Sequence, residues 1–169
     1  MLDTFLKHLD LCYFEVTEAF KGLADEHVWV RPHAGLLSVG ELAGHVAYWE
    51  AVRFAGEAED GSSERDLSNC TITSPLLDQR FGYFTSTVDT QPSAEHLTLT
   101  AAQVSAELQR IHTEAMTKLS ARNPDMESRA PQWHSSYADL LRYTTFHIAY
   151  HTGQMYSVRH LLGEKTPDN

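Results

Sequence analysis

Two histidines four residues apart carry the clearest chemical signal in this chain. His147 and His151 lie in an uninterrupted stretch with helical periodicity. Residues with this spacing share one helix face, with Cβ atoms roughly 5–6 Å apart. Two imidazoles placed this way can reach one metal ion at about 2.0–2.1 Å. The spacing alone is weak evidence, because the chain has 10 histidines and such a pair arises easily by chance.

The place of this pair within its helix strengthens the signal. The stripe expected to face the core contains Leu140, Thr144, His147, His151, Met155, Val158 and Leu162. His45 repeats the pattern in an earlier helix, between Leu42 and Trp49. Metal sites in helix bundles are built from such inward side chains on facing helices. Three neutral nitrogens would hold a transition metal and leave a coordination position for water, as in catalytic sites.

A second interpretation treats the three histidines as ordinary core or groove residues. An unpaired buried polar group costs roughly 1–3 kcal/mol, so each imidazole would then need a hydrogen-bond partner. Backbone carbonyls or the hydroxyls of Tyr48 and Tyr143 would serve. Spacing and predicted burial leave both interpretations open.

Four stretches with helical periodicity would position these residues. They cover residues 2–23, 38–55, 100–119 and 136–162. Ser38 with Glu41, and Thr100 with Gln103, have the pattern of capping boxes. Gly163 follows the last stretch, at the position where glycine commonly ends a helix. No alternating strand pattern is present, so the sequence predicts an all-α four-helix bundle.

A long connection, residues 56–99, separates the second and third predicted helices. Its acidic first part, 56–66, is predicted to be a solvated loop. Ser74 before Pro75 predicts a short helix near 75–81. Residues 82–97 are predicted to be loop. A connection of this length is unusual in a compact domain, so we expect it to cross one end of the fold and cover a site.

Composition limits the function classes. The chain has 169 residues, which predicts a single domain over 1–169, and 13 Lys+Arg against 23 Asp+Glu give a formal charge of −10. That charge disfavours binding to nucleic acid or an anionic membrane. No segment resembles a membrane span or a signal peptide. Two cysteines without a disulfide pattern favour a reducing compartment, and we expect a cytoplasmic protein.

The motifs, taken together, resemble those of the DinB-like (DinB/YfiT) superfamily. The first half of the pattern is Trp29-x-x-Pro32 followed by Gly35 and the run 38–50, and the second half is 147–154 with Arg159 and 162–163 beyond it. The resemblance covers most of the chain and is weakest over 56–99. It implies an up-down-down-up four-helix bundle, often dimeric, with a divalent metal such as nickel or zinc on His45, His147 and His151.

The resemblance also implies a class of activity. Relatives include metal-dependent transferases and isomerases that use low-molecular-weight thiols such as bacillithiol or mycothiol, and hydrolase-like members. A metal would lower the pKa of a bound water or thiol towards neutrality. We therefore expect a metal-dependent enzyme acting on a small molecule, a thiol-dependent S-transferase or a metal-assisted hydrolase. The alternatives are a non-catalytic metal- or small-molecule-binding stress protein, and a DNA-binding role that the charge disfavours.

Five further residues are candidates for the site. Arg53, Arg142 and Arg159 are cations that could bind the carboxylates of a thiol cofactor, the alternative being solvated surface charges. Gln154 could hydrogen-bond a ligand or pack. Glu50 could act as a base or bind the far side of a ligand imidazole, although it lies off the face of His45.

The remaining candidates have simpler expected roles. Trp49 and Tyr143 lie one turn from the presumed ligands and would line a pocket or the core. Cys12 is expected to be a small core residue. The other histidines are expected at the surface (His8, His27, His33, His96, His112 and His160), with His134 near the end of the bundle.

Overall fold

The computed structural model describes residues 1–56, 67–82, 91–130 and 134–167. Over these ranges the chain forms four long helices and no strand: α1 (Leu2–Glu18), α2 (Val39–Ala55), α3 (Ala101–Arg122) and α4 (Tyr137–Leu161). Short 3-10 helices are η1 (Asp25–His27), η2 (Leu67–Asn69), η3 (Gln79–Phe81) and η4 (His96–Thr98). The predicted all-α four-helix class is confirmed.

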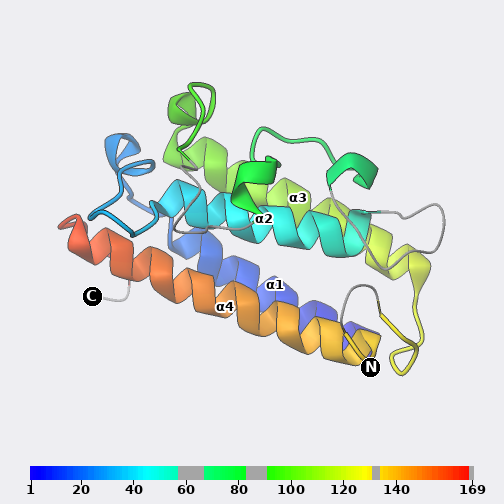
Figure 1. The fold of residues 1–169 in the computed structure, drawn as a ribbon. Coiled ribbons are helices and arrows are strands. Elements are labelled where there is room, and N and C mark those ends of the chain that lie inside the picture. The colour runs from blue at the N-terminus through cyan, green and yellow to red at the C-terminus, as the bar shows by residue number, and fades with distance from the viewer. Residues whose placement is uncertain (57–66, 83–90, 131–133, 168–169) are drawn as a thin grey trace.

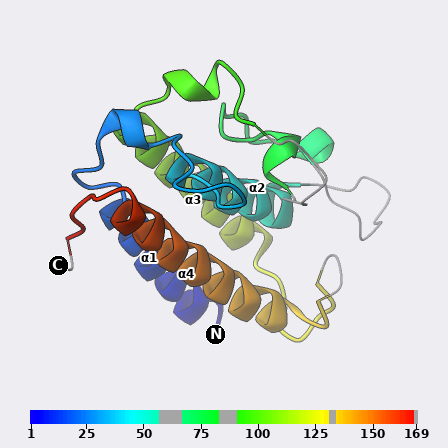
Figure 2. The same cartoon turned by 60° about the vertical axis from the view of Figure 1, so that its left-hand side comes forward.

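The helices follow the up-down-down-up order. α1 and α4 run in one direction, and α2 and α3 run in the other (Figure 1). α2 packs against α3 and α4, and α1 packs against the same two helices. Figure 2 shows α1 beside α4 and α2 beside α3. α2 and α4 are therefore antiparallel neighbours, so side chains from the middle of each can meet.

Apolar side chains fill the space between the helices. The largest fully buried ones include Phe54, Leu9, Leu108, Ile111, Leu119, Leu140, Leu141, Ile148 and Met155. α1, α3 and α4 each bury one stripe, as their periodicity predicts, whereas α2 is buried over nearly its whole surface. Burial of this surface is the main favourable term that holds the helices together. No helix in the described part of the chain is both long and apolar enough to cross a membrane.

The predicted helix starts are confirmed at atomic level. The Ser38 hydroxyl accepts from the Glu41 backbone N–H at 3.2 Å, and the Glu41 carboxylate accepts from the Ser38 N–H at 2.9 Å. Thr100 and Gln103 form the same reciprocal box at the start of α3. These contacts satisfy backbone donors that the first helical turn leaves without partners.

The helix ends differ slightly from the prediction. α1 ends at Glu18, earlier than the predicted end at 21–24, because residues 19–22 turn and Gly22 adopts a φ of 71°. α4 ends at Leu161, and Gly163 follows with a φ of 78°. Such left-handed backbone favours glycine, so the cap predicted at Gly163 is confirmed.

The connection between α2 and α3 contains less helix than predicted. Ser74 caps only a turn, with its hydroxyl accepting from the Leu76 N–H at 3.1 Å. The predicted helix at 75–81 is reduced to η3. The predicted loop at 56–66 lies outside the described residues except for Gly56, and so does the 83–90 part of the loop predicted at 82–97.

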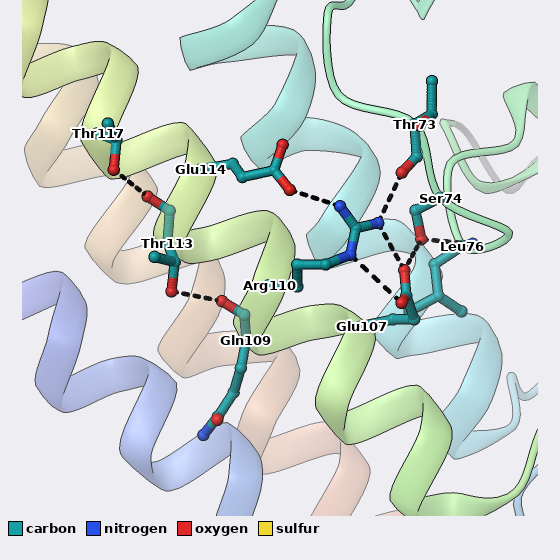
Figure 3. A network of polar contacts seen from close by, with 9 residues as sticks. All are labelled: Thr73, Ser74, Leu76, Glu107, Gln109, Arg110, Thr113, Glu114 and Thr117. Carbon is teal, nitrogen blue, oxygen red and sulfur yellow. Dashed lines mark hydrogen bonds and ion pairs between the residues drawn. The ribbon is translucent and has the colours of Figure 1, made fainter.

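An arginine on α3 fastens this connection to the bundle. Arg110 donates to the Thr73 carbonyl at 2.6 Å and to Glu107 at 2.7 Å, and it pairs with Glu114 (Figure 3). The Ser74 hydroxyl donates to the same Glu107 carboxylate at 2.7 Å. The backbone at 73–76 is therefore held against α3, which fixes where the following η3 turn meets α2.

Candidate metal centre

The structure brings together the three histidines that the sequence singled out. His45 comes from the middle of α2, and His147 and His151 come from successive turns of α4. Their ring centroids are 4.5–5.1 Å apart. One nitrogen from each ring lies within 4.8 Å of the other two. This is the only such group of three potential ligands in the described part of the chain.

The His45 ring is oriented by the backbone of η3. Its Nδ1 lies 2.7 Å from the Phe81 carbonyl oxygen. A carbonyl only accepts, so Nδ1 must carry the proton and Nε2 must carry the lone pair. That Nε2 faces the His147 Nε2 at 3.2 Å. A hydrogen bond from the far nitrogen to a carbonyl is the usual way in which proteins fix a ligating imidazole.

The position of Phe81 depends on a glycine in α2. A Cβ built at Gly44 would lie 2.4 Å from the Phe81 ring, so only glycine lets the ring rest on the helix there. Two further bonds pin the same turn to α2: Tyr48 donates to the Gln79 side chain at 3.1 Å, and Trp49 Nε1 donates to the Gly82 carbonyl at 2.8 Å. This support cannot be predicted from the sequence, because every residue type offers the same backbone carbonyl as an acceptor.

His151 is oriented in the same manner by a side chain. Its Nδ1 lies 2.7 Å from the Gln154 amide oxygen, so Nδ1 donates and Nε2 keeps its lone pair. The Gln154 amide nitrogen donates in turn to the Tyr150 hydroxyl at 3.3 Å. Gln154 therefore holds the ring of His151.

His147 has a buried nitrogen without a protein partner. Its Nδ1 has no hydrogen bond, and its Nε2 faces the lone-pair side of His45. Two ligands at about 2.0–2.1 Å on a tetrahedral ion are separated by roughly 3.3 Å, close to the 3.2 Å found here. The residues present thus fit a divalent ion: the donors are neutral imidazoles, two have fixed tautomers, and one nitrogen of each ring converges on the same point.

The electrostatics of the cluster keep the three rings neutral. Burial lowers the pKa of His45 to about 4 and that of His147 to about 2, and it lowers the pKa of His151 as well. The positive charge of Arg53 adds to this shift at each of the three rings. Neutral imidazole is the form that binds a metal ion, so the cluster is ready for an ion at neutral pH.

The histidines lie at the base of a cavity of about 430 Å³ between α2 and α4. Its lining consists of Leu37, His45, Trp49, Arg53, Tyr143, Phe146, His147, Tyr150, His151 and Gln154. Three of the lining residues, Tyr143, Phe146 and Tyr150, are 38%, 63% and 52% exposed. They form an aromatic rim where the cavity is open to solvent. The expectation that Trp49 and Tyr143 line a pocket is confirmed.

The described parts of the 56–99 connection do not cover this cavity. None of its residues at 67–82 or 91–99 contributes to the lining. They support His45 from behind, through η3, instead of closing the mouth. The prediction that the connection covers a site is therefore wrong for the residues that the structure describes.

Two of the three predicted cofactor-binding arginines lie elsewhere. Arg159 is fully buried and donates to the backbone carbonyls of Ala19, Lys21 and Lys165, so it fastens the ends of α1 and α4. The Arg142 side chain is 70% exposed and contacts Asp139 at 3.8 Å. Only Arg53 lines the cavity.

Glu50 also points away from the triad, contrary to its suggested role as a base. It is 1% exposed on the opposite side of α2, where its carboxylate accepts from the Tyr13 hydroxyl and from His112 Nδ1 at 2.8 Å. His112 Nε2 lies 3.2 Å from the Asp10 carboxylate, and its ring stacks on Tyr13 at 3.8 Å. These four residues form a polar network between α1, α2 and α3.

Several other histidines are more buried than predicted. His112 is 7% exposed and His96 is 3% exposed, so the expected surface positions of these two are wrong. His96 Nε2 donates to the Pro75 carbonyl at 2.8 Å, which satisfies it within the connection. His134 is buried near the cavity, with its ring 5.2 Å from that of Tyr143. Cys12 is half-buried beside the Thr145 carbonyl.

The fold and the site together define a class of protein: a helical bundle whose antiparallel helices α2 and α4 present a histidine triad at the base of an open cavity. The family model of the DinB superfamily matches residues 8–155, and the chain belongs to this superfamily. No curated protein and no solved structure matches the chain. The matched region includes all three histidines, and it confirms the resemblance seen in the motifs.

Proposed function

We propose that the chain binds one divalent metal ion, nickel or zinc, through His45, His147 and His151. The observation that carries this proposal is the convergence of three neutral imidazoles, two of them held by hydrogen bonds on their far nitrogens. The 3.2 Å between the Nε2 atoms of His45 and His147, close to the separation of two ligands on a tetrahedral ion, supports it further. Both nickel and zinc accept imidazole ligands, so the donor set does not choose between them.

We further propose that the protein is an enzyme acting on a small molecule, a thiol-dependent S-transferase or a metal-assisted hydrolase. An ion held here would supply Lewis acidity and lower the pKa of a water or thiol ligand. The open cavity above the triad supports turnover, because a substrate can reach the histidines. A fourth position closed by the protein, for example by Glu50 or by a residue of the 56–99 connection, would favour a non-catalytic binder. Glu50 points elsewhere, and the described residues of the connection do not line the cavity.

The chain's own residues would have distinct tasks in such a reaction. The Phe81 carbonyl and the Gln154 amide hold protons on the far nitrogens of His45 and His151, so the near nitrogens stay available. Arg53 supplies a fixed positive charge beside the triad. The aromatic rim orients the substrate and excludes water from its apolar part.

Elemental analysis of untagged protein purified without chelators tests the metal proposal. We expect about one equivalent of metal in the wild type, loss of that metal in His45→Ala, and retention in His8→Ala, a change at an exposed histidine of α1. All three proteins should keep the same far-UV helical signal. Absence of metal, even after reconstitution with nickel or zinc, would favour the alternative that the three histidines are ordinary core residues.

Turnover assays then separate the enzyme from the binder. Metal-loaded protein is offered a low-molecular-weight thiol with an electrophilic acceptor, and separately an activated ester. Turnover that is lost in His45→Ala supports the enzyme. Stoichiometric metal without turnover of either substrate favours the non-catalytic metal- or small-molecule-binding protein. The homodimer and cytoplasmic location expected from the sequence belong to the same proposal, and sedimentation analysis tests the former.

A further inference from the structure

A chain of hydrogen bonds runs along α4 from one histidine of the triad to the rim of the cavity. His151 Nδ1 lies 2.7 Å from the Gln154 amide oxygen, and the Gln154 amide nitrogen donates to the Tyr150 hydroxyl at 3.3 Å. Gln154 follows His151 by three residues and Tyr150 by four, so its amide can reach both side chains on one helix face. Tyr150 and His151 line the same cavity. The amide therefore connects the triad with the mouth of the cavity.

The orientation of this amide decides which group donates at each end of the chain of hydrogen bonds. An amide side chain accepts through its oxygen and donates through its nitrogen. With the oxygen towards His151, the imidazole donates from Nδ1 and keeps its Nε2 lone pair for a metal ion. The reverse orientation would place the amide nitrogen against Nδ1 and the ring proton on Nε2, where it would exclude an ion. An ion bound to Nε2 of His151 would therefore hold the amide in the orientation found here.

The same orientation leaves the hydroxyl hydrogen of Tyr150 available to a ligand. The Tyr150 oxygen accepts from Gln154, so its O–H points away from the amide. No group in the described part of the chain accepts that hydrogen. The Tyr150 ring lies edge-on to His151, with centroids 5.0 Å apart, and nearly parallel to Phe146 at 5.9 Å. The structure thus provides a positioned hydroxyl donor at the rim of the cavity.

The surroundings of this hydroxyl indicate the kind of ligand that it suits. Tyr143, Phe146 and Tyr150 form the rim, so flat apolar faces lie beside the donor. Exposed apolar residues scattered singly are common, but these three line one cavity. Aromatic rings pack well against another flat ring, and a hydroxyl donor is matched by an acceptor oxygen. A volume of about 430 Å³ is near the small end of ligand pockets and suits a compound of one ring.

We propose that Tyr150 donates a hydrogen bond to the carbonyl oxygen of a small aromatic carbonyl compound bound in this cavity. Tyr150 contacts the ligand, and Gln154 is a positioning residue that directs the Tyr150 hydroxyl. A carbonyl oxygen only accepts, so it pairs with the hydrogen that the amide leaves available. The inference rests on the proposed function, in that it takes this cavity as the substrate site and names the class of substrate.

Infrared difference spectroscopy of acetophenone, labelled with carbon-13 at its carbonyl, tests this inference. A carbonyl that accepts a hydrogen bond absorbs at a lower frequency than one in apolar surroundings. We expect this shift with zinc-loaded wild type and with Tyr137→Phe, the same change at the start of α4 and outside the cavity lining. Tyr150→Phe should lose the shift and bind acetophenone about 2–10-fold more weakly, as expected for one hydrogen bond. Absence of binding by the wild type, or the same carbonyl frequency in wild type and Tyr150→Phe, would overturn the inference.

Gln154→Glu tests whether residue 154 directs the hydroxyl. A carboxylate accepts from His151 as the amide oxygen does, so zinc should stay bound. It also accepts from Tyr150, whose hydrogen is then no longer available to the ligand. Gln154→Glu should therefore retain zinc in elemental analysis and lose the carbonyl shift. A folded, zinc-loaded Gln154→Glu that keeps the shift would contradict the inference.

Metal-free wild type, prepared with a chelator, separates this inference from the metal proposal. The zinc content of each protein decides the metal proposal independently of the infrared band. A shift that depends on Tyr150 in metal-free protein supports the inference even if the metal proposal fails. A shift that requires zinc and survives in Tyr150→Phe assigns the carbonyl oxygen to the ion, and it overturns the inference while the metal proposal stands.

Discussion

Replacing His112 with leucine tests whether the network around Glu50 stabilises the bundle. The Glu50 carboxylate is 1% exposed and accepts from only two groups, Tyr13 and His112, in the described structure. His112→Leu introduces an apolar side chain of similar bulk. The substitution removes a hydrogen-bond donor and a positive charge from the network. Glu50 would then be a buried carboxylate with a single hydroxyl donor.

The expected loss of folding stability is large, because the buried charge that remains on Glu50 has no counter-charge. Removing one partner of a buried ion pair costs roughly 3–5 kcal/mol, against a total stability of about 5–15 kcal/mol. With an m-value of about 2 kcal/mol/M in urea, the unfolding midpoint should fall by roughly 2 M. Adding Glu50→Gln to His112→Leu should recover much of this loss, since no buried charge then remains.

The pH dependence of the effect follows from the pKa of His112. Burial acts to lower this pKa, but the carboxylates of Glu50 and Asp10 outweigh burial, so it is raised. The folded protein therefore binds this proton more tightly than the unfolded chain, whose histidines titrate near 6.5. The stabilisation is complete below pH about 6.5 and is lost as the pH rises through the raised pKa.

Urea unfolding at a series of pH values from 6 to 9 measures both effects. The difference between wild type and His112→Leu should be largest at pH 6 and should narrow as the pH rises. A loss below about 1 kcal/mol at pH 6 would refute the reasoning. So would strict additivity of His112→Leu and Glu50→Gln, since it would show that the two residues act independently.

Three more outcomes are expected at the triad and its support. Gln154→Leu removes the acceptor for His151 and should weaken zinc binding about 10–100-fold in competition with a chromophoric chelator; unchanged affinity would contradict the role given to the amide. Gly44→Ala places a Cβ 2.4 Å from the Phe81 ring, so it should lower the free energy of unfolding in urea by about 1–3 kcal/mol and weaken zinc binding. No change in either quantity would mean that the ring moves freely. Metal-free protein should lose thermal stability as the pH falls below about 6.5. The histidines of the unfolded chain then bind protons, whereas folded His45 and His147, with pKa values of about 4 and about 2, stay neutral. A thermal unfolding midpoint that does not change from pH 7.5 to 5 would argue against the burial of these two rings.

The sequence allowed the fold to be predicted well where local signals set the structure. The capping boxes at Ser38 and Thr100 fix helix starts through bonds between residues three apart, so they can be read without knowing the neighbours. The same holds for the glycine cap at Gly163. The end of α1 was less clear, because its apolar stripe continues through the turn after Glu18.

The site could be predicted only in part, because residue type does not show which way a side chain faces. The histidine triad was found from helical spacing and from polar residues on apolar stripes. Glu50 and Arg159 were given roles in the pocket, but each is satisfied by a distant part of the chain: Glu50 by α1 and α3, Arg159 by backbone carbonyls. Such partners become visible only once the helices are packed.

His45 and His147 are far apart in the sequence, so an ion bound by both would crosslink two distant parts of the chain. The two rings are 102 residues apart in sequence and face each other across two helices. An ion shared by them would close a loop of that length, much as a disulfide does, and closing a loop of about 100 residues is worth up to about 4.7 kcal/mol in the chain-entropy model. Unlike a disulfide, this crosslink would form and break with the metal concentration and with pH. The lifetime of the folded chain would therefore depend on both.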